Sequence, residues 1–97
     1  MAVTILFTPA AMDASQYDEI IARLKQAGMF PAPGMISHVC FGGGNKLRVF
    51  DVWESQETFN EFGKALLPIL QELGVEAGQP EVGEIHNALE VRSIVKK

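Results

Sequence analysis

Residues 46–73 limit the fold more than any other stretch, because a strand pattern runs directly into a helix pattern there. From Leu47 to Trp53 the side chains alternate between two faces, and both faces carry apolar residues, which predicts a strand covered on both sides. The period changes at Ser55, which can cap a helix. Apolar residues then follow at helical spacing, at Phe59, Phe62 and Leu66. We therefore expect a central strand Leu47–Trp53 and a helix Ser55–Leu73.

The remaining segments complete the order strand, helix, strand, strand, helix, strand. The other expected elements are the strands Ala2–Phe7, Met35–Phe41 and Glu81–Ala88 and the helix Asp13–Ala27. Asp13 and Gln16 have capping-box spacing, and Pro68 predicts either a kink in the second helix or the start of a short new one. With right-handed crossovers, this order predicts an α+β fold. It is the ferredoxin-like βαββαβ plait, a four-stranded antiparallel sheet with two helices on one face, formed by a single domain spanning residues 1–97.

Charge and hydropathy exclude several kinds of partner. The net charge is −4 and no basic stripe is present, which argues against nucleic acid and anionic membranes. No apolar run is long enough to cross a membrane, and the first residues lack the pattern of a signal peptide, so we expect a cytoplasmic protein. Cys40 is the only cysteine, which excludes an internal disulfide bond.

Two helices can cover only one face of a four-stranded sheet, yet the strands are apolar on both faces. A large exposed apolar face is rare on monomers. The simplest cover is a second copy of the chain, which predicts a homodimer through the sheet face. We expect the C-terminal segment Leu89–Val95, which again alternates, to extend the sheet or to reach the partner.

The run Asp51-Val52-Trp53-Glu54-Ser55, followed by Phe59 and Phe62, resembles the strand-to-helix junction of the dimeric α+β barrel superfamily. The resemblance is closest to the antibiotic-biosynthesis-monooxygenase-like (ABM-like) branch and covers essentially the whole chain in its order of elements. It implies that two sheets join face to face into an α+β barrel. The superfamily includes cofactor-free monooxygenases, haem-degrading enzymes, cyclases and isomerases, so the motif is informative about fold and much less about activity.

The same resemblance argues against haem. At the places where haem-degrading members carry a Trp and a haem-ligating His, this chain has Phe62 and Glu72. Those members also carry an Asn in the first strand, and residues 1–7 contain none. We therefore expect no haem and no other cofactor.

The hairpin register decides which side chains meet. A symmetric loop over Gly42–Asn45 predicts pairing of Cys40 with Leu47 and of His38 with Val49. One face then carries His38, Cys40, Val49, Asp51 and Trp53, and the other carries Met35, Val39, Phe41, Phe50 and Val52. We expect the second, more apolar set to lie under the helices and the first set to face the interior of the barrel.

His38 and Asp51 are the candidate catalytic residues. In this register they lie diagonally opposite each other, within reach of long side chains. A carboxylate beside an imidazole fixes its tautomer and stabilises its protonated form, which suits a residue that moves a proton. The alternative is a structural polar pair, either self-satisfied in the core or placed in the dimer seam.

Three further residues are candidates for the wall of a ligand pocket. Trp53 can stack on an aromatic ligand or simply fill the core. Cys40 is either a nucleophile beside His38 or a buried thiol, and His86 either joins the cavity or lies on an edge strand. His38, Cys40, Asp51 and His86 lack the clustered spacing of metal ligands, so we expect no metal site.

Two functions follow from these observations. The first is a cofactor-independent monooxygenase or isomerase that acts on a small, largely apolar substrate, with His38 as acid and base and Asp51 as its orienting partner. The second is a non-catalytic dimer that binds a small ligand or has a structural role. A pocket that contains His38 and Asp51 and has room for a ligand favours the first.

Overall fold

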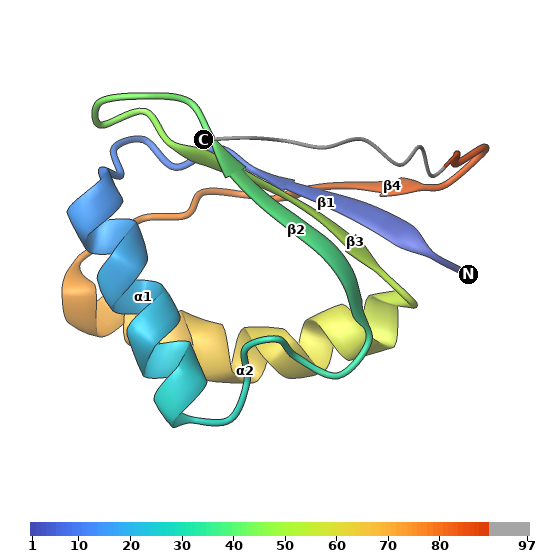
Figure 1. Ribbon diagram of the computed structural model, residues 1–97, viewed down its shortest axis with the longest axis horizontal. Coiled ribbons are helices and arrows are strands. Elements are labelled where there is room, and N and C mark those ends of the chain that lie inside the picture. The colour runs from blue at the N-terminus through green and yellow to red at the C-terminus, as the bar shows by residue number, and fades with distance from the viewer. Residues whose placement is uncertain (90–97) are drawn as a thin grey trace.

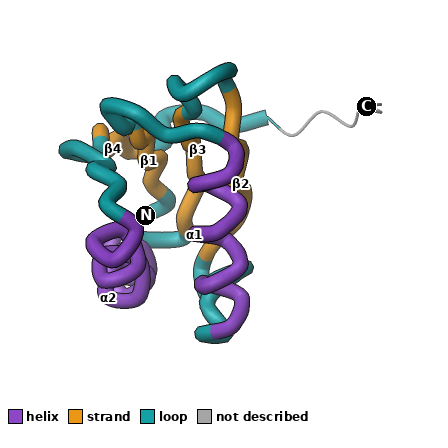
Figure 2. Tube along the Cα trace, turned by 90° about the vertical axis from the view of Figure 1, so that its left-hand side faces the viewer, coloured by secondary structure: helices purple, strands orange, loops and turns teal. Residues whose placement is uncertain are grey.

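The computed structural model of the chain describes residues 1–89. The elements are β1 (Val3–Phe7), α1 (Ala14–Gln26), β2 (Met35–Phe41), β3 (Arg48–Trp53), α2 (Gln56–Leu73) and β4 (Glu81–Glu84). They follow the expected βαββαβ order, and the four strands form one antiparallel sheet in the order β2-β3-β1-β4. Both helices lie on the same face of this sheet (Figure 1). Figure 2 shows α1 and α2 next to each other on that face, where they are in contact.

Local signals at the helix ends are confirmed. Asp13 caps α1, and its side chain and that of Gln16 form the reciprocal hydrogen bonds of a capping box. Ser55 caps α2 by accepting a hydrogen bond from the backbone N–H of Thr58. Pro68 lies inside α2, which runs as one helix from Gln56 to Leu73, so no second helix begins there.

The fourth strand is shorter than expected, ending at Glu84 and not at Ala88. β4 pairs with β1 from Leu6 back to Val3, where β1 begins, and one further bond joins the Ile85 N–H to the Ala2 carbonyl. The strand therefore ends beside the first residue of β1. The expected extension over 89–95 lies outside the described residues apart from Leu89, which is exposed.

The hairpin register differs from the symmetric one by two residues. Cys40 pairs with Val49 and His38 pairs directly with Asp51. The cause is Met12, whose backbone exchanges hydrogen bonds with the Asn45 carbonyl and the Leu47 N–H. Residues 45–47 therefore bond to the segment before α1 and not to β2, which leaves a longer loop. A shift of two keeps the side chains from Ser37 to Phe41 on their expected faces. Met35 is the exception, because an irregularity between Met35 and Ser37 pairs it with Trp53, and it packs against the core under the helices.

The assignment of the two sheet faces was wrong. The face with His38, Val49, Asp51 and Trp53 packs under the helices, where Asp51 and Trp53 are almost wholly buried. Val39 and Phe50 lie on the other face and are 51% and 37% exposed. Counting polar residues favoured the opposite assignment, but burial of Asp51 is possible because both of its oxygens have hydrogen-bond donors.

The core lies between the helices and this sheet face. Ile5, Leu24 and Trp53 are its most deeply buried apolar side chains. The Trp53 ring meets the rings of Phe59 and Phe62, with centroids 5.7 and 5.0 Å apart. These contacts join the end of β3 to the first turns of α2, as the strand-to-helix pattern predicted. Within residues 1–89, no helix has the length and apolar character needed to cross a membrane.

Candidate active site

Asp51 anchors a chain of hydrogen bonds under the helices. It lies in the middle of β3, between the buried side chains of Val49 and Trp53, and is 1% exposed. His38 lies directly opposite on β2, and its Nδ1 is 2.7 Å from Asp51 Oδ1. The indole N–H of Trp53 donates to Asp51 Oδ2 over 3.2 Å. The carboxylate therefore accepts a hydrogen bond on each oxygen.

These partners fix the tautomer of His38. A carboxylate only accepts, so the neutral imidazole carries its proton on Nδ1 and has a lone pair on Nε2. The Tyr17 hydroxyl lies 2.6 Å from Nε2 and donates to it. The Tyr17 ring is stacked near the imidazole, with centroids 6.0 Å apart, and the Phe30 ring meets it edge-on at 5.0 Å. The imidazole is thus held by polar contacts at both nitrogens and by two aromatic rings.

The surroundings keep Tyr17 and Cys40 protonated near neutral pH. Burial raises the pKa of Tyr17 to about 12, and the negative charges of Cys40, Asp51 and Asp18 act in the same direction. Burial also raises the pKa of the Cys40 thiol, with a smaller contribution from Asp18. Tyr17 is therefore a neutral hydroxyl that donates to His38. Cys40 lacks the lowered pKa that activates a nucleophilic thiol.

A cavity with a volume of about 50 Å³ lies beside this network, between the helices and the sheet. Apart from Tyr17, His38 and Asp51, all of its lining residues are apolar. Much of the wall is formed by Phe7, Ile20, Leu24, Val49, Phe62 and Leu66. The volume is several times the ~10–15 Å³ that one water needs and about a third of the ~150 Å³ of a cavity that takes up benzene. A small ligand fits, and a ring-sized one requires some side chains to move.

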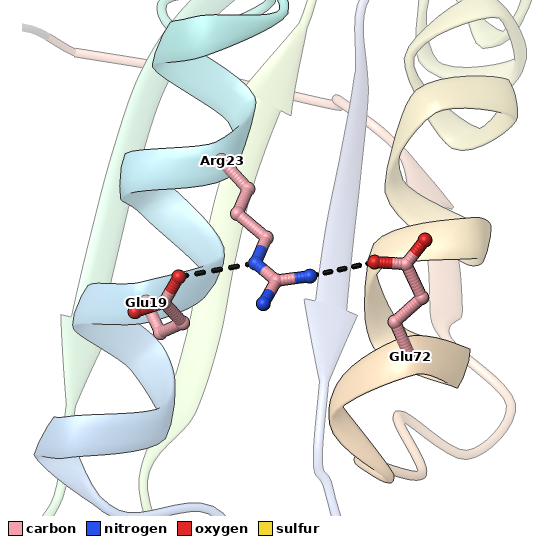
Figure 3. A network of polar contacts seen from close by, with 3 residues as sticks. All are labelled: Glu19, Arg23 and Glu72. Carbon is pink, nitrogen blue, oxygen red and sulfur yellow. Dashed lines mark hydrogen bonds and ion pairs between the residues drawn. The ribbon is translucent and has the colours of Figure 1, made fainter.

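The two helices above the cavity are joined on their outer side by an ion-pair network. Arg23 on α1 contacts Glu19 on the same helix at 3.0 Å and Glu72 on α2 at 2.6 Å (Figure 3). These side chains are largely exposed, so each pair contributes about 1 kcal/mol at most. Glu72, which stands where haem-degrading proteins of the resembling superfamily place a ligating His, is here the partner of Arg23.

The structure brings together some of the candidate residues and separates others. His38, Asp51 and Trp53 form one network, but Trp53 does not line the cavity, because it is wholly covered and its role is to donate to Asp51. Cys40 shares their sheet face and is only half-buried, outside the lining. His86 follows the short β4 and is exposed, away from the cavity. In the described part of the chain, no three His, Cys, Asp or Glu side chains are grouped to hold a metal ion.

Tyr17 and Phe30 are the site residues that sequence reasoning missed. Tyr17 was grouped with the apolar stripe of α1, which is correct for its ring and incomplete for its hydroxyl. One signal was available: a tyrosine on a buried helix face needs a polar partner for its O–H. The partner was not deducible, because periodicity does not say which strand residue a helix crosses. No comparable signal marks Phe30.

Comparison with solved structures supports the fold. SnoaB, a cofactor-independent oxygenase from Streptomyces nogalater, aligns with a TM-score of 0.67 at 17% identity, over 91% of this chain and 96% of its own. A candidate antibiotic biosynthesis monooxygenase from Chloroflexus aurantiacus J-10-fl aligns with a TM-score of 0.64 at 16% identity, over 93% and 98%. The protein YJCS aligns at 0.62 and 13% identity, over 89% and 100%.

These three likenesses establish a shared fold. The expected resemblance to ABM-like proteins is therefore confirmed at the level of architecture, across most of the chain. No protein-family model matches the sequence, and no curated protein matches it. Sequence identity below one fifth carries no information about which reaction, if any, the chain catalyses.

Proposed function

We propose that this chain is a cofactor-independent monooxygenase, or an isomerase with the same first step, that acts on a small and largely apolar substrate. The observation that carries the proposal is the His38–Asp51 pair in the wall of an otherwise apolar cavity. The description of SnoaB as a cofactor-independent oxygenase is consistent with it. The shared fold alone is not an argument for this activity. The argument rests on the oriented imidazole beside the cavity.

Both reactions begin when a proton leaves a carbon or hydroxyl of the substrate. A neutral imidazole held through its Nδ1–H keeps its lone pair on Nε2, which accepts from the Tyr17 hydroxyl in the structure and is the atom that would take the proton. Asp51 orients the ring and stabilises the imidazolium that forms, and Trp53 in turn holds Asp51. In an oxygenase without a cofactor, the electron-rich substrate anion itself reduces O₂. One oxygen atom then enters the product and the other leaves as water; in an isomerase, the proton returns to a different carbon.

The proposal includes a homodimer. Leu6, Val39 and Phe50 are paired across β1, β3 and β2, so they lie in one row on the sheet face opposite the helices. Val39 and Phe50 are 51% and 37% exposed, and both helices lie on the opposite face of the sheet (Figure 1). A second copy packed against the row removes the apolar surface from water. Sedimentation at micromolar concentration tests this, with twice the chain mass expected and a clean monomer contradicting it.

One observation favours the alternative, a protein that binds a small ligand without turning it over. Each polar group of the network already has a partner, since Tyr17, His38, Asp51 and Trp53 are linked in series. A self-satisfied network is also what a purely structural polar cluster looks like. The two functions differ in one respect: only the first requires that His38 exchange protons with a ligand.

Proton exchange therefore provides the test. Small phenols and enolisable ketones are incubated with the protein in D₂O, and hydrogen–deuterium exchange at carbon is followed by NMR together with oxygen consumption. We expect His38→Asn to lower the rate about 10²–10⁴-fold, and the matched control His86→Asn, on an exposed His, to leave it unchanged. Equal rates in His38→Asn and wild type, with both folded, would exclude His38 as the base. Saturable binding without exchange would support the alternative.

A further inference from the structure

The lone pair of His38 does not face the cavity freely. Nε2 is occupied by the Tyr17 hydroxyl at 2.6 Å, and Nδ1 is engaged by Asp51. Tyr17 itself lines the cavity. A ligand in the cavity therefore meets the Tyr17 oxygen on its way to His38, or must displace Tyr17 to reach Nε2.

We propose that the Tyr17 hydroxyl is the group through which a ligand in this cavity passes its proton to His38. The inference rests on the proposed function and adds a catalytic residue to it. The step is balanced as follows: the ligand O–H or C–H bond breaks and its proton binds Tyr17 Oη, while the Tyr17 O–H bond breaks and its proton binds His38 Nε2. Tyr17 is neutral before and after, the ligand becomes an anion, and His38 becomes an imidazolium beside Asp51.

Three observations favour passage through Tyr17 over its displacement. A hydroxyl both donates and accepts, so Tyr17 can hold its bond to Nε2 while it accepts from the ligand. The ring is kept in place by its position on α1 and by stacking near the imidazole. The high pKa of about 12 keeps Tyr17 neutral, so it acts as a carrier and not as the base. After the transfer, its O–H donates to the ligand anion, which an apolar cavity would otherwise disfavour.

4-Nitrophenol is a suitable probe, because it titrates near neutrality and its anion absorbs visible light. Binding is measured by equilibrium dialysis, and the ionised fraction of the bound probe by absorbance, for wild type, Tyr17→Phe and His38→Asn. We expect the wild-type protein to bind the probe more ionised than it is in free solution. Tyr17→Phe should lower the phenolate-to-phenol ratio about tenfold or more, because it removes a hydrogen bond to the anion.

Two controls distinguish the effect of losing the Tyr17 hydroxyl from a general effect of substitution on the fold. Ser37→Ala removes an exposed hydroxyl from the opposite face of β2 and should leave the ratio unchanged. The chain has a single tyrosine, so replacing it biosynthetically with 3-fluorotyrosine alters only this side chain and keeps the hydroxyl. Fluorine makes the hydroxyl a stronger donor to the bound anion, so the ionised fraction should rise above the wild-type level, and an unchanged fraction would count against the relay. This replacement also tests the inference if Tyr17→Phe does not fold.

The outcomes are distinct. A Tyr17→Phe protein that ionises the probe as well as wild type, or better, shows that the ligand reaches Nε2 directly and overturns the relay while His38 remains the acceptor. If wild type and His38→Asn ionise the probe equally, His38 is not the proton acceptor. That result overturns the proposed function as well. Binding of the probe by wild type without ionisation overturns the relay.

Discussion

The single tyrosine of the chain makes the burial of the Tyr17 hydroxyl open to direct measurement. The structure predicts that Tyr17 ionises at a pKa of about 12, against an ordinary value of 10.0. Burial is the main cause, and the neighbouring charges of Cys40, Asp51 and Asp18 add to it. Because no other tyrosine is present, the ultraviolet absorbance of tyrosinate during an alkaline titration reports this residue alone.

The raised pKa also predicts how stability depends on pH. Above pH 10 the unfolded chain loses the tyrosine proton while the folded chain keeps it, so the free energy of unfolding falls as pH rises toward 12. The contribution is fully present below pH 10. A shift of two pKa units corresponds to about 2.7 kcal/mol. Tyr17 is only half-buried, so solvent screening reduces the expected loss to about 1 kcal/mol.

Tyr17→Phe isolates this contribution. Urea unfolding followed by circular dichroism is compared for wild type and variant, below pH 10 and near pH 12. The stability advantage of wild type over the variant should shrink by about 1 kcal/mol across this range, while the effects of groups that do not interact with Tyr17 cancel in the difference. A tyrosinate midpoint near pH 10, or an advantage that does not change with pH, would refute the burial of the Tyr17 hydroxyl beside these charges.

Three further predictions test other parts of the structure. Asp51→Asn should lower the free energy of unfolding by about 1–3 kcal/mol, because the amide turns an N–H toward a buried donor; a change under about 0.5 kcal/mol in urea unfolding, the range of neutral surface substitutions, would contradict the network. Gly34→Ala should cost more than about 1 kcal/mol, since Gly34 has φ +86° and an added Cβ would lie 2.5 Å from Thr58 Cβ. Gly43→Ala, with no atom within 4 Å, is its control, and equal melting temperatures would count against the close approach. Phe50→Glu places a charge on the open sheet face and should convert the proposed dimer to a monomer in sedimentation, and a dimer of unchanged mass would move the interface elsewhere.

The elements of the fold were predictable because their signals are local. The two-residue period of β3, the capping box at Asp13 and the cap at Ser55 each depend on residues close in sequence. The register of the β2–β3 hairpin was not predictable in this way, because it depends on Met12 bonding to the loop from a distant segment. Helix and strand order therefore followed from the sequence, whereas one pairing register did not.

The candidate site was also predictable only where the signal is local in sequence. His38 and Asp51 were found because alternation places them on one face of adjacent strands, and a register shift of two preserves that relation. Their position under the helices was not found, because a carboxylate was expected to avoid the core. Trp53 and His38 supply the hydrogen bonds that make its burial possible. Tyr17 was missed because its partner depends on how α1 crosses the sheet.

The central claim is that His38 can accept a proton from the side of the cavity, which requires one particular tautomer. Nitrogen-15 NMR of the histidine rings tests this without a substrate. The chain has two histidines, so the spectrum of His38→Asn assigns both, and the exposed His86 serves as the reference. We predict that neutral His38 carries its proton on Nδ1 and that Nε2 shows the shift of a hydrogen-bonded acceptor. A proton found on Nε2, or a tautomer average like that of His86, would contradict the account.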